Sequence, residues 1–425
     1  MQAHYVHSQL PSLSGHLLLG LLLSCLLFDS AHALNDKAVN QDLQTTKTVL
    51  LPIEAPYHAQ RTRLVKDFDF LYQSEQSEFT FATPYNDRWK FSYMVNITIG
   101  NPPQPVSLQL DSRALEIWVQ SSANPGCRNT DLEFCAISGV YNRRKSTTAR
   151  ATTYQGTITY EDSTYARALA IEDVATVGGK EIPSLIFGES NESTALYGRV
   201  GLGRMSKTGG TRPDTLQNKM IESGLTNVAA YSLWLDDHDS STGAILFGGV
   251  DNSKFEGELI NIDLAPLTEK IPNMYYINIV SIAANIGGKR SKVIGDEYKF
   301  PIALNPMTSW SFLPFYIGSR LATKIGGTKY NRNLGTFMID CERSQLADFV
   351  EFEFAGVKVP VLLKQLVSKV GETDKGQPIC ALAFTAILPK KGDVIQPLEY
   401  FLGDSVLRSA YVVYGISHMR CCNPV

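Results

Sequence analysis

The chain has 425 residues, of which 44% are hydrophobic and 19% are charged, and its 39 Lys and Arg nearly balance its 42 Asp and Glu. This composition excludes a largely disordered chain, and the length is enough for two or three domains. The lack of a basic excess argues against nucleic acid as a main partner. The 32 Gly, 20 Pro, 19 Tyr and 19 Phe favour turns and strands and predict an all-β fold with many hairpins.

The N-terminal segment indicates the compartment. An apolar run over residues 17–28 precedes Ala31-His32-Ala33, which is the order of a secretory signal peptide, and the run is too short for a membrane span. The competing interpretation is a buried N-terminal helix, because no Lys or Arg precedes the run. We predict a signal peptide over residues 1–33 and export from the cell, with the vacuole as the alternative. No membrane span is expected in the mature chain.

The next segment, residues 34–85, is polar and then basic, with few apolar runs. We interpret it as a prosegment or linker. It contains no dibasic pair, which argues against removal by a proprotein convertase. Two β domains are expected after it, over residues 86–265 and 266–425.

Short stretches of alternating apolar residues between turn signals predict strands in this region. In chain order they are residues 93–99, 106–110, 157–160, 244–247, 275–282, 349–354 and 411–414. A helical pattern covers residues 213–222. Strands therefore dominate the expected fold.

Two pairs of segments share one arrangement. A hydrophobic strand runs into Asp111, and residues 200–203 follow about 90 residues later. A second strand, residues 300–304, runs into Asn305, and residues 401–404 follow about 98 residues later. This similar spacing predicts a duplicated lobe.

The first of these strands lies in a longer signature. Residues 93–104 and 110–119, the latter reading Leu-Asp-Ser-Arg-Ala-Leu-Glu-Ile-Trp-Val, resemble the N-terminal motif of the pepsin-like aspartic peptidases. Residues 160–163 resemble the family's flap, residues 248–251 with Gly257 its lobe-joining segment, and residues 402–404 with Arg408 and Tyr411 its C-terminal motif. The resemblance covers residues 86–422. It implies a bilobal, all-β fold with a peptide-binding cleft between the lobes.

In that family two aspartates, one from each lobe, share a proton and together activate water. The resemblance assigns the first position to Asp111 and places Asn305 at the second. An amide side chain neither ionises nor carries a transferable proton at working pH. Residues 308–309 and 313–314 match the family's continuation, which supports this register.

The neighbours of both positions also depart from the family pattern. Where the family has Thr after each Asp, this chain has Ser112 in one lobe and Pro306 in the other. Where the family has Gly next, this chain has Arg113 and Met307, and Thr308 follows Met307. Ala114 replaces a Ser of the family, and Arg199 stands in the element before Gly201. Arg113 would hold Asp111 ionised if the two side chains are in reach. We predict a catalytically inactive homologue that keeps the cleft for a peptide or protein ligand. The alternative is an aspartic-type endopeptidase with weak or atypical activity that uses Asp111.

The remaining candidates concern the flap and the covalent modifications. Tyr160 corresponds to the family's flap tyrosine, with simple packing as the alternative. Six cysteines follow the signal peptide, an even number that predicts disulfides. Metal binding is the competing interpretation, but no CxxC pair supports it. No metal or cofactor is expected. The resemblance implies the pairs Cys127 with Cys135 and Cys341 with Cys380, and leaves Cys421 and Cys422 to pair with another chain or remain strained. Asn191, in an expected polar loop, and Asn96, in a strand-like run, are glycosylation sequons.

Overall fold

The computed structural model describes residues 47–54, 93–127, 135, 138–160, 164–204, 215–237, 242–265, 274–306, 308–387, 400–415 and 418–424. All of them belong to one compact unit, Lys47–Val425. The predicted signal peptide, most of the predicted prosegment, residues 161–163 and Met307 lie outside the described residues.

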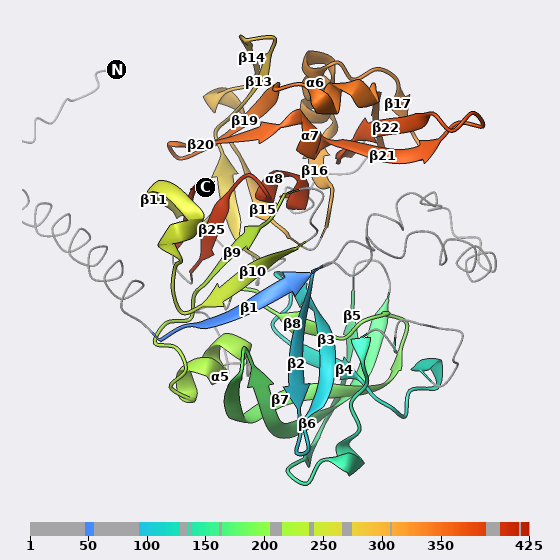
Figure 1. Ribbon diagram of the computed structural model, residues 1–425, viewed down its shortest axis with the longest axis vertical. Helices are drawn as coiled ribbons and strands as arrows, with labels where there is room; N and C mark the ends of the chain where they lie inside the picture. The colour runs from blue at the N-terminus through green and yellow to red at the C-terminus, as the bar shows by residue number, and fades with distance from the viewer. Residues whose placement is uncertain are drawn as a thin grey trace, which may run out of the picture. The chain divides into compact units, whose positions relative to one another are not determined.

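Strands dominate the described ranges and form four sheets (Figure 1). The largest has 13 strands, in the spatial order β11 (Phe255–Asp263), β26 (His418–Pro424), β25 (Tyr411–Tyr414), β9 (Tyr231–Leu235), β10 (Thr242–Phe247), β1 (Val49–Glu54), β2 (Met94–Ile99), β3 (Gln104–Asp111), β8 (Arg199–Gly201), β4 (Ile117–Gln120), β7 (Lys180–Ser193), β6 (Tyr165–Val177) and β5 (Arg150–Thr159).

The other three sheets contain the later strands. The five-stranded sheet has the order β12 (Tyr276–Ile279), β15 (Phe300–Leu304), β24 (Phe401–Leu402), β16 (Ser311–Pro314) and β23 (Phe384–Ile387). One four-stranded sheet has the order β14 (Lys289–Ile294), β13 (Ser281–Ile286), β19 (Phe349–Phe354) and β20 (Val357–Leu362). The other has the order β17 (Tyr330–Asn331), β18 (Thr336–Ile339), β22 (Pro378–Leu382) and β21 (Val367–Glu372). Within the described ranges the α-helices are α5 (Leu216–Glu222), α6 (Phe315–Ile325), α7 (Leu363–Leu366) and α8 (Asp404–Leu407).

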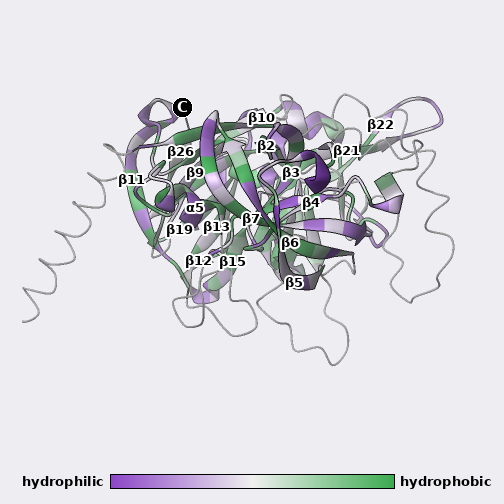
Figure 2. Cartoon of the chain, turned by 90° about the horizontal axis from the view of Figure 1, so that it is seen from below, coloured by the Kyte–Doolittle hydropathy of each residue, from purple (hydrophilic) through white to green (hydrophobic). Residues whose placement is uncertain are grey.

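The strands form because their apolar residues recur at every second position. Along β19 the even-numbered residues Val350, Phe352 and Phe354 are buried, and their neighbours are only partly covered. Successive side chains of a strand point to opposite faces, so this pattern buries one face of the sheet. In Figure 2 hydrophobic and hydrophilic residues are interspersed along the strands. This confirms the predicted all-β fold.

Two groups of five strands repeat one topology. The order β2-β3-β8-β4-β7 is matched by the order β12-β15-β24-β16-β23. In both groups the successive pairs are antiparallel, parallel, antiparallel and parallel. The molecule is therefore bilobal, and the duplication predicted from spacing is present in the strand pairing.

Strand β1 comes from the segment interpreted as a prosegment or linker. It pairs with β10 on one side and with β2 on the other, and in Figure 1 it is the blue strand between them. Val49, Leu51 and Ile53 are buried while Leu50 is 52% exposed, so one face of β1 belongs to the core. This alternation was the signal that the sequence interpretation did not use.

Sheet pairing also crosses the expected boundary between residues 265 and 266. The C-terminal strands β25 and β26 join the 13-stranded sheet, where β25 pairs with β9 and β26 pairs with β11. The two halves of the chain therefore share a hydrogen-bonded sheet. Among the described residues no helix is long and apolar enough to cross a membrane.

Some predicted elements differ in extent from the observed ones. The stretch 275–282 contains parts of two strands, β12 and β13, which are separated at Val280. The stretch 157–160 contains the last three residues of the ten-residue strand β5, Arg150–Thr159, and the residue that follows it. The predicted helix is α5, which begins after Thr215 because the Thr215 side chain accepts a hydrogen bond from the backbone N–H of Asn218 at 3.3 Å; residues 213–214 lie outside the described ranges.

Candidate functional site

Asp111 and Asn305 stand at equivalent ends of the two repeated motifs. Asp111 is the last residue of β3 and lies opposite Gly201 of β8. Asn305 directly follows β15, and its backbone N–H donates to the carbonyl of Leu402 in β24 at 2.9 Å. Because Leu110 pairs with Val200 and Leu304 pairs with Leu402, the two registers align Asp111 with Asn305.

Two glycines hold the loops after these residues in the same way. A Cβ atom on Gly201 would lie 2.4 Å from the carbonyl carbon of Leu115, and one on Gly403 would lie 2.5 Å from the carbonyl oxygen of Thr308. Both distances are far below van der Waals contact, so each glycine is required by the close approach of a loop backbone. The loop that follows each strand end is therefore pressed against the neighbouring strand in both lobes.

Both oxygens of the Asp111 carboxylate have donors. Oδ1 accepts from the backbone N–H groups of Arg113 at 2.9 Å and of Ala114 at 3.3 Å. Oδ2 accepts from Nη1 of Arg199 at 3.0 Å. The Arg113 side chain is also in reach, with Nε 3.9 Å from Oδ1. Asp111 is thus a buried carboxylate that faces two guanidinium groups.

Arg199 also contacts the tyrosine that corresponds to the family's flap residue. Its guanidinium carbon lies 3.5 Å from the ring centroid of Tyr160. The hydroxyl of Tyr160 accepts a hydrogen bond from Nε1 of Trp118 at 2.6 Å, and Trp118 pairs with Arg199 between β4 and β8. Burial raises the pKa of Tyr160 to about 12, while Arg199 lowers it and Asp111 raises it.

The sequence marked Arg199 as a departure from the family pattern but did not predict these contacts. Trp118 and Arg199 both lie in segments that carry the resemblance to the family. Their pairing, however, depends on a register between residues 81 positions apart, which one sequence does not reveal.

Asn305 is fully buried, and its side chain connects the two lobes. Its Oδ1 accepts a hydrogen bond from the hydroxyl of Ser112 at 3.4 Å. Pro306 is buried beside it, and the buried Thr308 hydroxyl donates to the carbonyl of Trp310 at 3.1 Å. The structure thus brings Asp111, Ser112, Arg113, Tyr160 and Asn305 into one connected set of contacts, and Met307 lies outside the described residues.

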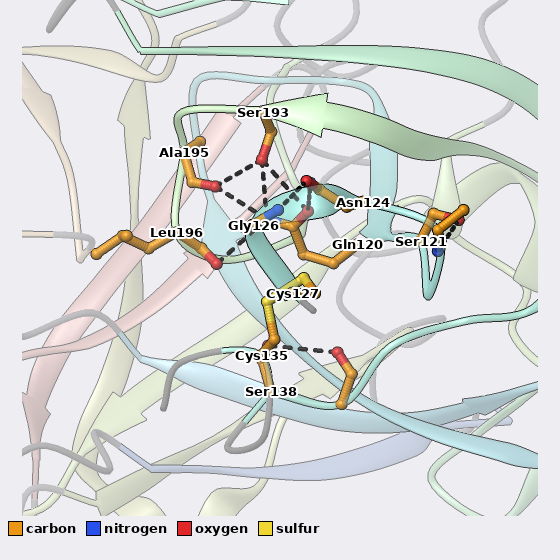
Figure 3. The surroundings of a disulfide bond; sticks show 12 residues. Gln120, Ser121, Asn124, Gly126, Cys127, Cys135, Ser138, Ser193, Ala195 and Leu196 are labelled. Atoms are coloured by element: carbon orange, nitrogen blue, oxygen red, sulfur yellow. Dashed lines mark hydrogen bonds between the residues drawn. A yellow bond between two sulfur atoms is a disulfide. The ribbon is translucent and has the colours of Figure 1, made fainter. Parts of the chain in front are cut away.

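The two disulfides implied by the resemblance are present, Cys127 with Cys135 and Cys341 with Cys380. Figure 3 shows the first beside a polar network centred on Gln120, at the end of β4. Nε2 of Gln120 donates to Ser193 Oγ and to the carbonyl of Ala195, both at 2.9 Å, and its Oε1 accepts from Asn124 Nδ2 at 2.9 Å. This network anchors the loop that carries the disulfide to the strand that carries Trp118.

The remaining modification candidates are placed as follows. Cys421 is 4% exposed and lies in β26 between Ile260 of β11 and Val412 of β25, which does not favour pairing with another chain; the side chain of Cys422 lies outside the described part. Asn96 is exposed on β2, where its side chain accepts from the Ser107 hydroxyl. Asn191 is exposed, but it lies on β7 and not in a loop, as the extra residue of a bulge opposite β6.

The comparisons with known proteins agree with this geometry. The family model described as eukaryotic aspartyl protease matches residues 92–422, and the chain belongs to this family. Among the similar proteins, the probable aspartic-type endopeptidase opsB of Aspergillus fumigatus is 29% identical over 332 residues, which are 77% of this chain and 67% of that protein.

Two yeast relatives show similar identity. Aspartic proteinase yapsin-3 of Saccharomyces cerevisiae is 29% identical over 344 residues, covering 77% of this chain and 64% of that protein. An acid protease of Saccharomycopsis fibuligera is 27% identical over 339 residues, covering 77% of this chain and 79% of that protein. The chain thus spans about two thirds of the length of the opsB protein and of yapsin-3.

Proposed function

We propose that this chain is an exported, catalytically inactive member of the aspartyl protease family that binds a peptide or protein between its lobes. One observation carries the proposal: Asn305 stands where the repeated strand pairing requires the partner of Asp111. The family reaction needs one carboxylate to accept a proton from water while the other donates one to the peptide carbonyl. A carboxamide supports neither step.

The expected loss of catalytic rate is large. Removing one member of an acid–base pair lowers a rate by about 10²- to 10⁴-fold. Here the remaining carboxylate is also engaged, because Asp111 accepts from the backbone of Arg113 and from the side chain of Arg199. With three protein donors on its two oxygens, this carboxylate has little capacity left to accept a hydrogen bond from a water molecule.

The alternative function is weak or atypical endopeptidase activity that uses Asp111. It is favoured by the retained Asp111, by the repeated strand pairing that positions it, and by the relatives, which are named endopeptidases. In that case the amide of Asn305 would orient a water molecule while Asp111 acts alone.

The deciding experiment compares the purified exported protein with its Asp111→Asn variant on an unfolded protein substrate, in acidic and in neutral buffer. We expect no cleavage by either. Cleavage that is lost in Asp111→Asn and blocked by a peptide with a secondary alcohol in place of the scissile amide would establish the alternative.

A restoration experiment tests the assignment from the opposite direction. The combined change of Asn305→Asp, Arg113→Gly, Pro306→Thr and Met307→Gly restores the family's second Asp and its neighbours in that lobe, and the family's Gly in the first lobe, while Ser112, Ala114 and Arg199 remain. Appearance of cleavage in this variant would show that the scaffold is otherwise competent. The other three changes, Arg113→Gly, Pro306→Thr and Met307→Gly, without Asn305→Asp are the matched control and should remain inactive.

Export and processing belong to the same proposal. We infer a signal peptide over residues 1–33, a following segment over 34–85, and two lobes over 86–265 and 266–425, with glycans on Asn191 and Asn96. Since β1 supplies buried residues to the main sheet, we infer that residues 47–54 stay with the mature protein. Mass spectrometry of the N-terminus and of glycopeptides from the exported protein tests each of these points.

A further inference from the structure

Arg199 lies between two groups that belong to the candidate site. On one side Nη1 donates to Oδ2 of Asp111 at 3.0 Å, and on the other the guanidinium carbon is 3.5 Å from the ring centroid of Tyr160. A cation within about 6 Å of an aromatic ring face is attracted by the ring. The guanidinium therefore joins the carboxylate and the ring into one group of three in contact.

This group of three side chains is shielded from water. The side chains of Arg199 and Asp111 are 10% and 2% exposed. Electrostatic attraction is stronger in such surroundings than in water, for both the ion pair and the contact with the ring. Tyr160 is additionally held by the hydrogen bond from Trp118, so its hydroxyl and its ring face are both engaged.

Arg199 differs from Arg408, another well-buried arginine, whose side chain is 6% exposed. Arg408 donates to the carbonyls of Asp236 and Asp237 at 2.9 and 3.2 Å and to Oδ2 of Asp404 at 3.0 Å. Among the described residues Arg199 donates only to Asp111, and its buried Nε has no hydrogen-bond partner there. A buried arginine with a structural role usually satisfies most of its donors. Arg199 is thus held by the two site groups and little else.

We propose that Arg199 is an internal ligand of the site, a positioning residue that binds the carboxylate of Asp111 on one side and the ring of Tyr160 on the other. An external ligand then reaches the Asp111 carboxylate only when the Arg199 side chain moves away. This closes the N-terminal half of the site independently of Asn305. The inference rests on the proposed function only in taking the ligand to be a peptide or protein.

The first test measures how firmly the β5–β6 hairpin is held next to Tyr160. Arg199→Met removes the charge at similar length, and Arg167→Met is the matched control, since Arg167 lies on β6 and forms an exposed pair with Glu192. Backbone hydrogen exchange over residues 154–160 and 164–170 is followed by mass spectrometry. We expect exchange about tenfold faster or more in Arg199→Met and unchanged exchange in Arg167→Met.

A second variant protects the test against loss of folding. Arg199→Met leaves Asp111 buried beside one cation fewer, whereas Arg199→Met combined with Asp111→Asn removes both charges of the pair. The combined variant should remain folded by circular dichroism and should show the same fast exchange in the hairpin. Wild-type exchange in this folded variant would overturn the proposal.

The third measurement concerns ligand access. Calorimetry with a peptide that carries a secondary alcohol in place of one amide should show binding to Arg199→Met about tenfold tighter than to the wild type, and no gain in Arg167→Met. Equal affinity for wild type and Arg199→Met would refute the role of Arg199 as an internal ligand. Cleavage of peptides by the wild type would instead refute the proposed inactivity and leave the hairpin result to stand by itself.

Discussion

The carboxylate of Asp111 and the guanidinium of Arg199 form a buried ion pair, with Nη1 and Oδ2 3.0 Å apart. Arg199 lies on β8, beside the strand that ends in Asp111, and the two side chains come from positions 88 residues apart. In this chain the family's reactive carboxylate is therefore one half of an internal contact.

The pair should matter for stability. Asp111→Asn leaves Arg199 buried with its main partner removed, and breaking a buried pair from one side costs about 3–5 kcal/mol. We expect a loss of this order in the free energy of unfolding, measured with urea at neutral pH. Glu192→Gln breaks the exposed pair with Arg167 and should cost about 1 kcal/mol or less. Equal losses in the two variants would contradict the importance of burial here.

The close approach at Gly403 gives a second prediction. Gly403→Ala places a methyl group 2.5 Å from the carbonyl oxygen of Thr308, so the loop after Asn305 must shift. Such overpacking costs about 1–3 kcal/mol of unfolding free energy. Gly371→Ala is the control because its Cβ would meet nothing within 4 Å, and its effect should stay within about 1 kcal/mol. A neutral Gly403→Ala would show that the loop is not pressed against β24.

Strand β1 can be tested by its two faces. Ile53 is 1% exposed and Leu50 is 52% exposed, although both lie in the same strand. We expect Ile53→Ala to lower the free energy of unfolding by about 2–5 kcal/mol and Leu50→Ala to change it by about 0.5 kcal/mol or less. Denaturation of both variants is the measurement. Similar small effects would mean that β1 does not belong to the folded unit.

The raised pKa of Tyr160 predicts a loss of folding stability in alkaline solution. Its pKa is about 12 in the folded protein against about 10 in the unfolded chain, so the folded state holds the proton more tightly. The contribution is complete below about pH 10 and is lost as the pH rises towards about 12. Tyr160→Phe should remove about 1 kcal/mol of the decline between pH 9 and 11, as seen in urea midpoints. An identical decline in both proteins would argue against the shifted pKa.

The sequence predicted the class of fold correctly because the signals are local. Alternation along residues 349–354 and 411–414 needs only neighbouring positions, and both stretches are strands with the predicted bounds. The duplication was visible because each strand that ends in Asp111 or Asn305 is followed at a similar distance by its partner strand. The interpretation failed at Val49–Glu54, where a short apolar alternation stands inside a polar segment and its two partner strands come much later in the chain.

The sequence by itself predicted the strand-rich fold and the duplication from composition, alternation and spacing. Its resemblance to the family implied the two disulfides and the residues at the two strand ends. Only the tertiary structure decided what those residues contact. The pairing of β8 with β3 and β4 places Arg199 between Asp111 and Tyr160, and the meeting of the two lobes places Ser112 against Asn305. Such contacts join residues tens to hundreds of positions apart, and their geometry is set by sheet register and packing, which local patterns do not contain.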